Sequence, residues 1–138
     1  MPKKVPRTRA GETMTEGGFN SFIKSGLRQM STRWKPKYDV KKQARHHTKL
    51  SNGKGRLVFH SLCNSCQELV PETTSSVDHI HPIIDPNVGF TNWDDVIYAM
   101  FCEAEGLQVL CKPCHDAKTK KEKAIDTERR RQERASRL

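Results

Sequence analysis

The sequence predicts a small α+β fold with a zinc-stabilised core, a helical N-terminal arm and a charged C-terminal helix. Of its 138 residues, 34% are hydrophobic and 30% are charged. Such a chain cannot bury a large core along its whole length, and small domains of this kind commonly need a staple such as a metal ion. Two Cys-x-x-Cys pairs offer that staple. Short β-branched runs and helical periodicities surround these pairs, which indicates both strands and helices.

The N-terminal part is predicted to be a tail followed by a helical arm. Residues 1–17 are rich in Lys, Arg, Pro and Gly, and we expect a disordered basic tail there. We expect a basic helical arm over residues 18–56. Its first helix, capped by Asn20 or Ser21, ends before Pro36, which opens a second short helix. One apolar stripe runs along the first helix and consists of Phe19, Phe22, Ile23, Leu27 and Met30.

The predicted core spans residues 57–122 and begins and ends near the cysteine pairs. Strands are expected over residues 56–60, 76–80 and 107–110, where β-branched and apolar side chains gather. A glycine-rich turn, Ser51 to Gly55, precedes the first of them.

Two helices complete the prediction. The first is capped by Thr91 or Asn92 and is expected to end at Gly106, with one face formed by Trp93, Val96, Ile97, Met100 and Phe101. The second is expected to begin at Cys114. Residues 123–138 should continue it as a charged helix or tail that frays beyond Thr119.

The charge is distributed unevenly along the chain. Residues 1–56 carry 15 Lys and Arg against 3 Asp and Glu, residues 57–114 carry 1 against 8, and residues 115–138 carry 9 against 5. Basic ends around an acidic centre are typical of a protein that binds a polyanion and holds a cation. We therefore expect DNA as a partner, contacted mainly through phosphates by Lys35, Lys37, Lys41, Lys42, Arg45, Lys118, Lys120 and Lys121.

No apolar run is long enough to span a membrane, and the basic start lacks the apolar stretch of a secretory signal. The expected location is therefore a reducing, cytoplasmic compartment. There, paired cysteines are typical metal ligands rather than disulfides. Structural zinc is predicted on four thiolates, Cys63, Cys66, Cys111 and Cys114. Cys102 is left over as a free thiol, on the predicted helix after Asn92.

Three further residues suggest chemistry beside the cysteines. Asp78 offers a hard oxygen ligand suited to Mg²⁺ or Mn²⁺. His79 follows it directly and can act as a general base near neutral pH. His115 comes immediately after the last cysteine and can bring a nitrogen ligand to the same ion. Singly, these residues have structural alternatives: a turn cap, a packed histidine and a helix-start residue.

Together, these motifs resemble those of the HNH endonuclease family. The resemblance rests on Asp78-His79-Ile80-x-Pro82 and on Leu107-Gln108-x-Leu110-Cys111-x-x-Cys114-His115-x-x-Lys118-Thr119, and it covers roughly residues 57–122. More narrowly, the chain is similar to small phage and prophage HNH nucleases with two zinc-binding Cys-x-x-Cys pairs. If it is phage-encoded, the cytoplasm would be that of a bacterial host.

The resemblance implies a ββα-metal core that grips one divalent ion and hydrolyses DNA by nicking or double-strand cleavage. Asp78 and His115 would hold the ion, which is Mg²⁺ or Mn²⁺ with Ni²⁺ as a further candidate, and His79 would be the general base. The alternative is a non-catalytic, zinc-dependent DNA-binding or regulatory phage protein. Charge alone also leaves RNA open as the nucleic acid.

One position departs from the family pattern. The family carries an asparagine before the Leu-Gln pair, where it braces the loop and orients the base, whereas this chain has Gly106. Either backbone bonds hold the loop, or Asn92 substitutes, or activity is weakened. Thr119 stands where some relatives supply another histidine ligand, so water or the scissile phosphate would fill that coordination position.

Overall fold

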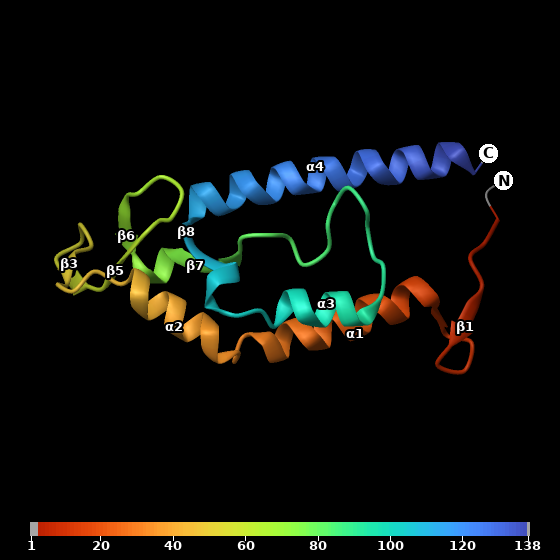
Figure 1. The fold of residues 1–138 in the computed structure, drawn as a ribbon, viewed down its shortest axis with the longest axis horizontal. Helices are drawn as coiled ribbons and strands as arrows, with labels where there is room; N and C mark the ends of the chain where they lie inside the picture. The colour runs from red at the N-terminus through yellow and green to blue at the C-terminus, as the bar shows by residue number, and fades with distance from the viewer. Residues whose placement is uncertain (1–2, 138) are drawn as a thin grey trace. The chain divides into compact units, whose positions relative to one another are not determined.

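The chain has a mixed α/β fold with small two-stranded antiparallel sheets (Figure 1). The structure, a computed structural model, describes residues 3–137. It divides the chain into two compact units, Met1–Arg33 and Trp34–Leu138. The predicted arm of residues 18–56 is thus divided between the two units.

The N-terminal unit contains a hairpin where we predicted disorder. Strands β1 (Arg7–Arg9) and β2 (Met14–Thr15) pair antiparallel, and helix α1 (Glu16–Ser31) follows. Thr8 Oγ1 and Arg9 Nε each donate to a Glu16 carboxylate oxygen at 2.9 Å, which fastens the hairpin to the first helical turn. The prediction of a disordered tail is therefore wrong for residues 7–15. Its first two residues, 1 and 2, lie outside the described part of the chain.

Helix α1 begins earlier than its apolar stripe indicated. Thr15, rather than Asn20 or Ser21, is the N-cap, and its Oγ1 accepts a hydrogen bond from Gly18 N at 3.0 Å. The first turn is polar and glycine-rich, so periodicity alone could not detect it. A threonine cap satisfies one of the free N–H groups at the helix start and stabilises this turn.

The second unit begins with helix α2 (Lys35–Ala44), which Pro36 opens as predicted. Its buried Val40 packs with Leu107 and Val109 in one hydrophobic cluster. Just before the helix, Trp34 Nε1 donates to the Cys102 carbonyl oxygen at 2.7 Å. The indole also packs edge-on against Phe101, with 5.5 Å between ring centroids. Trp34 therefore has a packing role.

Two short hairpins follow α2. Strand β3 (Leu50–Ser51) pairs with β4 (Leu57–Val58), and β5 (His60–Leu62) pairs with β6 (Leu69–Pro71). The single strand predicted over residues 56–60 is thus broken at Phe59, because its two parts join different partners. The glycine-rich turn between β3 and β4 is confirmed. A single 3₁₀ turn, η1 (Glu72–Thr74), links β6 to the next strand.

The centre of this unit is a third hairpin followed by a long helix. Strand β7 (Ser75–His79) pairs with β8 (Leu107–Cys111) in a register that places Asp78 opposite Gln108. Strand β8 is buried almost throughout, with Leu110 only 2% exposed. Helix α4 (Lys112–Ser136) starts at once, two positions before the predicted start at Cys114. It does not fray at Thr119.

Helix α3 (Trp93–Met100) lies in the connection between β7 and β8. Asn92 caps it as predicted, accepting a hydrogen bond from Asp95 N at 2.9 Å, and Val96 and Met100 are buried. The helix ends at Met100 rather than at Gly106, which belongs to a separate 3₁₀ turn, η2 (Ala104–Gly106). Cys102 therefore lies beyond the helix, where it packs against the Val40 cluster.

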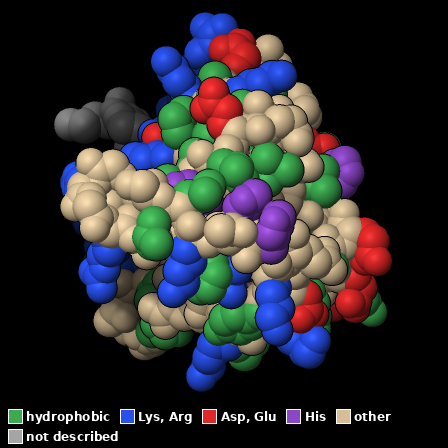
Figure 2. All heavy atoms as spheres, turned by 90° about the vertical axis from the view of Figure 1, so that its left-hand side faces the viewer, with side chains coloured by type: hydrophobic (Ala, Val, Ile, Leu, Met, Phe, Trp, Pro, Cys, Tyr) green, Lys and Arg blue, Asp and Glu red, His purple; other side chains and the backbone are tan. Residues whose placement is uncertain are grey.

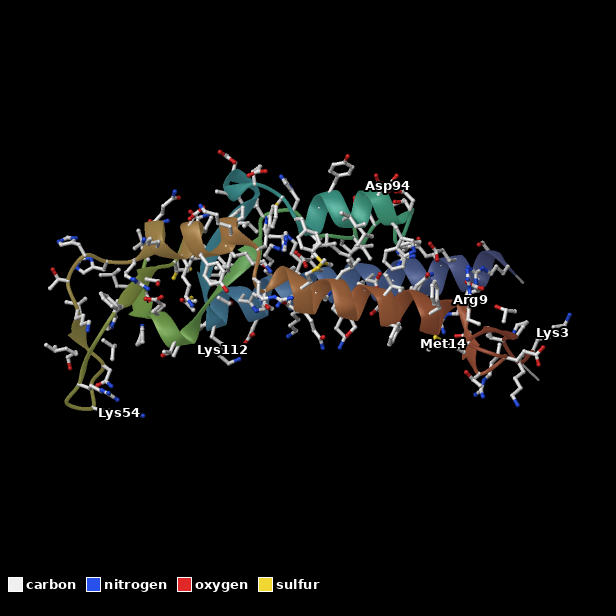
Figure 3. The ribbon with its side chains drawn as sticks, turned by 90° about the horizontal axis from the view of Figure 1, so that it is seen from below. Lys3, Arg9, Met14, Lys54, Asp94 and Lys112 are labelled. Atoms are coloured by element: carbon white, nitrogen blue, oxygen red, sulfur yellow. The ribbon has the colours of Figure 1, made fainter. Side chains whose placement is uncertain are left out.

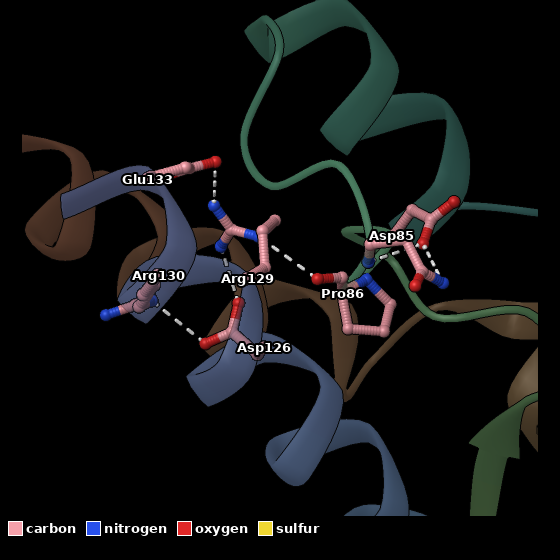
Figure 4. A network of polar contacts seen from close by, with 7 residues as sticks. Asp85, Pro86, Asp126, Arg129, Arg130 and Glu133 are labelled. Carbon is pink, nitrogen blue, oxygen red and sulfur yellow. Dashed lines mark hydrogen bonds and ion pairs between the residues drawn. The ribbon is translucent and has the colours of Figure 1, made fainter. Parts of the chain in front are cut away.

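Arg129 fastens the second half of α4 to the loop before α3 (Figure 4). Its Nε donates to the Pro86 carbonyl oxygen at 3.0 Å, while Asp126 and Glu133 hold its two Nη atoms at 2.6 and 2.8 Å. Gly89 has φ +84° and lies so close that a Cβ there would approach Arg129 Nη1 to 2.7 Å. These contacts explain how so charged a helix stays anchored beyond its first turns.

A bidentate ion pair fastens the end of α2 to η1. Arg45 Nε and Nη2 donate to the two Glu72 carboxylate oxygens at 2.8 and 2.7 Å, and the Glu72 side chain is only 13% exposed. The Arg45 hydrogen bonds hold the pKa of Glu72 below its usual value, although burial opposes this, and Lys41 adds a weaker attraction. Arg45 also lies over the Phe59 ring, 4.4 Å from its centroid.

This pair predicts a pH-dependent loss of stability in Glu72→Gln. At neutral pH the variant should unfold more easily by about 1–2 kcal/mol, because it loses a charge-assisted, half-buried pair. The folded pKa is depressed, so the contribution of Glu72 is complete above the ordinary carboxyl pKa near 4.5 and is lost as pH falls through the folded value. Denaturant unfolding of parent and variant at several pH values measures the difference between their free energies of unfolding, which should shrink as the pH falls. Glu68→Gln, at an exposed position, is the control; an equal loss there would refute the role of the pair.

Candidate functional site

The four predicted cysteines come together. Cys63 and Cys66 lie in the turn between β5 and β6, Cys111 ends β8, and Cys114 lies in the first turn of α4. Their sulfur atoms all lie within 4.8 Å of one another, and this group could hold a metal ion such as zinc. The Cys66 and Cys111 sulfurs are 3.8 Å apart. Tetrahedral zinc with S–Zn bonds of about 2.3 Å places its sulfurs about 3.8 Å apart, so the donor set fits.

The surroundings of Cys63 favour a thiolate. Its burial opposes ionisation, but hydrogen bonds from the backbone of Cys111, Cys66 and Ser65 lower the pKa of its thiol to about 6. The thiolate is the form that binds metal. None of the chain's five cysteines, all within the described residues, forms a disulfide. Cys102 is outside the cluster, and burial raises the pKa of its thiol.

Asp78 and His115 also meet, across the contact between β7 and α4. His115 Nε2 lies 3.9 Å from Asp78 Oδ1. A third residue reaches the same carboxylate, because Lys118 Nζ lies 2.9 Å from Asp78 Oδ2, 2.9 Å from the His79 carbonyl oxygen and 2.7 Å from Glu122 Oε1. The Asp78 side chain is 17% exposed, so its charge is compensated mainly within the protein.

His79 faces the other side of the strand, toward the end of α3. Its Nε2 lies 2.9 Å from the carbonyl oxygen of Met100, the last residue of that helix. A carbonyl oxygen can only accept, so Nε2 carries a hydrogen and the neutral ring keeps its lone pair on Nδ1. The Met100 contact therefore fixes the tautomer and the orientation of the ring. The backbone of His79 is held by strand pairing with Leu107 and by the hydrogen bond that its carbonyl oxygen accepts from Lys118.

Backbone bonds hold the chain at Gly106. The Gly106 carbonyl oxygen accepts from Ile80 N at 2.9 Å, directly after His79, and Gly106 N donates to Glu103 O at 3.0 Å. A Cβ at this position would lie 2.9 Å from the sulfur of Cys102, so a larger residue does not fit without movement. Asn92 is occupied in capping α3 and does not brace His79. Thr119 is exposed on α4.

Two amides connect the first cysteine pair to Asp78. Asn64, inside that pair, donates from Nδ2 to Gln108 Oε1 at 2.9 Å, and Asn64 N donates to the Val109 carbonyl oxygen at 2.8 Å. Because Gln108 Oε1 accepts this hydrogen bond, the other end of the amide, Nε2, donates to Asp78 Oδ2 at 3.3 Å. Sequence reasoning assigned neither residue a role. The pairing of the two strands, with Asp78 opposite Gln108, was the signal that could have identified Gln108.

The predicted DNA-contacting cations are distributed over two helices, and several have acidic partners. On α2, Lys35 pairs with Asp39 at 2.9 Å and Lys41 faces Glu72, as does Arg45 directly after the helix. Lys37 and Lys42 lie on the same helix. On α4, Lys118 belongs to the Asp78 cluster, whereas Lys120 and Lys121 are exposed.

Comparisons with known proteins add no relative: no family model matches the chain, and neither does any curated protein or solved structure. Across residues 3–137, no helix is long and apolar enough to cross a membrane. The site is therefore interpreted from its own geometry.

We expect the metal content to depend on the cysteine cluster but not on Cys102. Cys63→Ser should lose bound zinc and should melt at a lower temperature than the parent, because Cys63 is one of the four sulfur donors and is fully buried beside Cys111 of the second pair. Cys102→Ser should keep the metal. Elemental analysis of the purified proteins gives their zinc content, and thermal melts with and without chelator give their melting temperatures. Zinc retained in Cys63→Ser, or lost in Cys102→Ser, would contradict the assignment.

Proposed function

We propose that the chain is a metal-dependent HNH-type endonuclease that hydrolyses phosphodiester bonds of DNA. The observation that carries the proposal is the meeting of Asp78 and His115 at 3.9 Å, with His79 next to Asp78 in the strand and its ring held by the Met100 carbonyl oxygen. A carboxylate, an imidazole and a second imidazole of fixed tautomer are the donors and the base that such hydrolysis needs.

The order of the elements supports the same proposal. A β7–β8 hairpin followed directly by α4 is the ββα arrangement that the family resemblance implies. Zinc on the four thiolates would fasten the end of this hairpin to the start of α4 and to the β5–β6 turn. Four thiolates complete a tetrahedral site and leave no open position, so this zinc would be structural.

In the proposed reaction, Asp78 and His115 would hold a divalent ion, Mg²⁺ or Mn²⁺ with Ni²⁺ as a further candidate. When bound, such an ion would supply positive charge that stabilises the phosphate and the leaving oxygen. His79 accepts a proton from the attacking water at Nδ1, while the Met100 carbonyl holds Nε2–H in place. The bond from phosphorus to the 3′ oxygen breaks as the new P–O bond forms, and the leaving 3′ oxygen takes a proton from solvent water, which gives 5′-phosphate and 3′-hydroxyl ends.

The charge of the chain supports a nucleic acid as the substrate, which in this proposal is DNA. The net charge is +9, and residues 57–114 hold 8 of the 16 acidic side chains that oppose it. Cations that meet phosphates release counterions, which drives binding and makes it sensitive to salt. In this proposal the protein acts in the cytoplasm, that of a bacterial host if a phage encodes it.

Two observations favour a second candidate, a non-catalytic zinc-dependent DNA-binding module. Gly106 stands in place of the family's asparagine, and the Lys118 ammonium already contacts the Asp78 carboxylate, at Oδ2, which compensates the charge that a divalent ion would need. Tight, salt-sensitive DNA binding that Asp78→Ala leaves intact, without cleavage under any divalent ion, would support this candidate.

His79→Ala should abolish most cleavage while leaving the fold and the zinc content intact. Loss of a general base commonly lowers the rate by about 10²–10⁴-fold. Supercoiled plasmid incubated with Mg²⁺, Mn²⁺, Ni²⁺ or chelator measures this loss and separates nicking from double-strand cutting. His81→Ala, an exposed histidine two residues away, is the matched control and should cut like the parent. If His79→Ala cuts as well as the parent, the mechanism is wrong.

Asn64→Asp should impair the site more than Asn64→Ala, because aspartate cannot donate to Gln108. The Gln108 amide would then turn its N–H group toward the new carboxylate and its oxygen toward the carboxylate of Asp78. Mn²⁺ affinity and plasmid cleavage should fall by about tenfold or more, the usual effect of removing a partner that orients a metal ligand. Glu68→Gln, at an exposed position in the same turn, should change neither. Equal behaviour of Asn64→Asp and the parent would show that the amide contact is dispensable.

A further inference from the structure

The β3–β4 hairpin presents cations that the catalytic proposal does not use. Between Asp39 and Glu68 the chain has no acidic residue, and this stretch contains Lys49, Lys54 and Arg56. No ion pair to any of these three side chains occurs within residues 3–137. They differ in this from Arg45, whose charge Glu72 already compensates.

The loop that carries Lys54 and Arg56 is held in one conformation. Asn52 Oδ1 accepts from both Lys54 N and Arg56 N at 2.8 and 3.2 Å, and Asn52 N donates to Arg56 O at 2.8 Å. Gly53 and Gly55 have φ of +79° and +83°, which the turn requires and glycine tolerates. A surface ordered in advance loses less entropy when it binds a partner.

The same loop is open to a large partner. Residues 53–57 are all exposed, and Lys54 lies at the tip of the hairpin, away from the rest of the second unit (Figure 3). A Cβ at Gly53 or Gly55 would meet nothing within 4 Å, so a backbone can approach closely on both sides of Lys54. Figure 2 shows this end of the molecule toward the viewer, with Lys and Arg side chains projecting at its edges.

Lys49 and two apolar side chains extend the surface toward the base of the hairpin. Lys49 Nζ lies 4.8 Å from the centroid of the Phe59 ring, which is 38% exposed, and Leu57 is 66% exposed. Cations interleaved with exposed apolar side chains on a two-stranded ribbon suit a nucleic-acid groove, where cations contact phosphates and apolar groups contact sugars and bases.

We propose that the β3–β4 hairpin is a DNA-contacting arm that grips phosphates of duplex DNA through Lys49, Lys54 and Arg56. This inference rests on the proposed function and adds to it a contact surface separate from Asp78, His79 and His115. The arm belongs to the same compact unit as those residues, and strand β5 leads from it directly into the first cysteine pair.

The test compares two double variants that remove the same charge. Lys54→Ala/Arg56→Ala removes exposed cations without partners, whereas Arg130→Ala/Arg131→Ala removes cations of α4 that already pair with Asp126 and Glu128. Fluorescence anisotropy with a short labelled DNA duplex is measured over a series of salt concentrations.

The hairpin variant should bind about tenfold or more weakly and should lose about 2 from the slope of log K against log salt. The α4 variant should change much less. Zinc content and melting temperature should match the parent in both variants. In the hairpin, the hydrogen bonds of Asn52 are made with backbone atoms of residues 54 and 56, which the substitutions keep.

Four outcomes would overturn the proposal. Equal weakening by both double variants would show a general effect of net charge. Unchanged DNA binding by the hairpin variant, while the parent still binds and cuts plasmid, would refute the arm and leave the proposed function standing. Loss of affinity for duplex RNA but not for DNA would make the hairpin an RNA surface. If the parent neither binds nor cuts DNA, the proposed function itself fails, and the arm fails with it.

Discussion

Four cysteine sulfurs within 4.8 Å of one another connect the parts of this chain that carry the candidate site. One pair belongs to the β5–β6 turn, and the other joins the end of β8 to the start of α4. The apolar core around them is small, with Val40, Val96, Met100, Leu107, Val109 and Leu110 as its buried aliphatic side chains. A core of this size stabilises a domain only marginally. A metal ion held by the four sulfurs would therefore supply a large share of the free energy that keeps Asp78 and His115 together.

Much of this arrangement could be predicted from the sequence, because its signals are local. The Cys-x-x-Cys spacing predicted the cluster, β-branched content predicted β7 and β8, and Pro36 and Asn92 predicted two helix starts. Errors arose where a contact with a distant residue decides the structure. Glu16 orders the hairpin of residues 7–15 from the following helix. Helix α3 ends at Met100, whose carbonyl oxygen accepts a hydrogen bond from His79, and no residue type in the sequence indicates such a bond.

The candidate site shows the same limit in its polar contacts. Asp78, His79 and His115 could be named from sequence because their chemistry is distinctive. The contacts that position them could not, since they involve an amide pair, a lysine and two backbone carbonyl groups. Gly106 illustrates the point: the absence of asparagine suggested a weakness, yet its backbone accepts a hydrogen bond from Ile80, and the sulfur of Cys102 occupies the space a side chain would need.

The hydrogen bonds from Asn64 through Gln108 to Asp78 would couple the cysteine cluster to any cation that binds at Asp78. Such coupling is reciprocal: any factor by which a metal in the cluster raises affinity at Asp78 is the factor by which a cation at Asp78 raises affinity in the cluster. Two ions of different chemistry, one preferring sulfur and one preferring oxygen, would then bind cooperatively without sharing a ligand. The protein would respond to the joint availability of both ions, and scarcity of either would weaken its hold on the other.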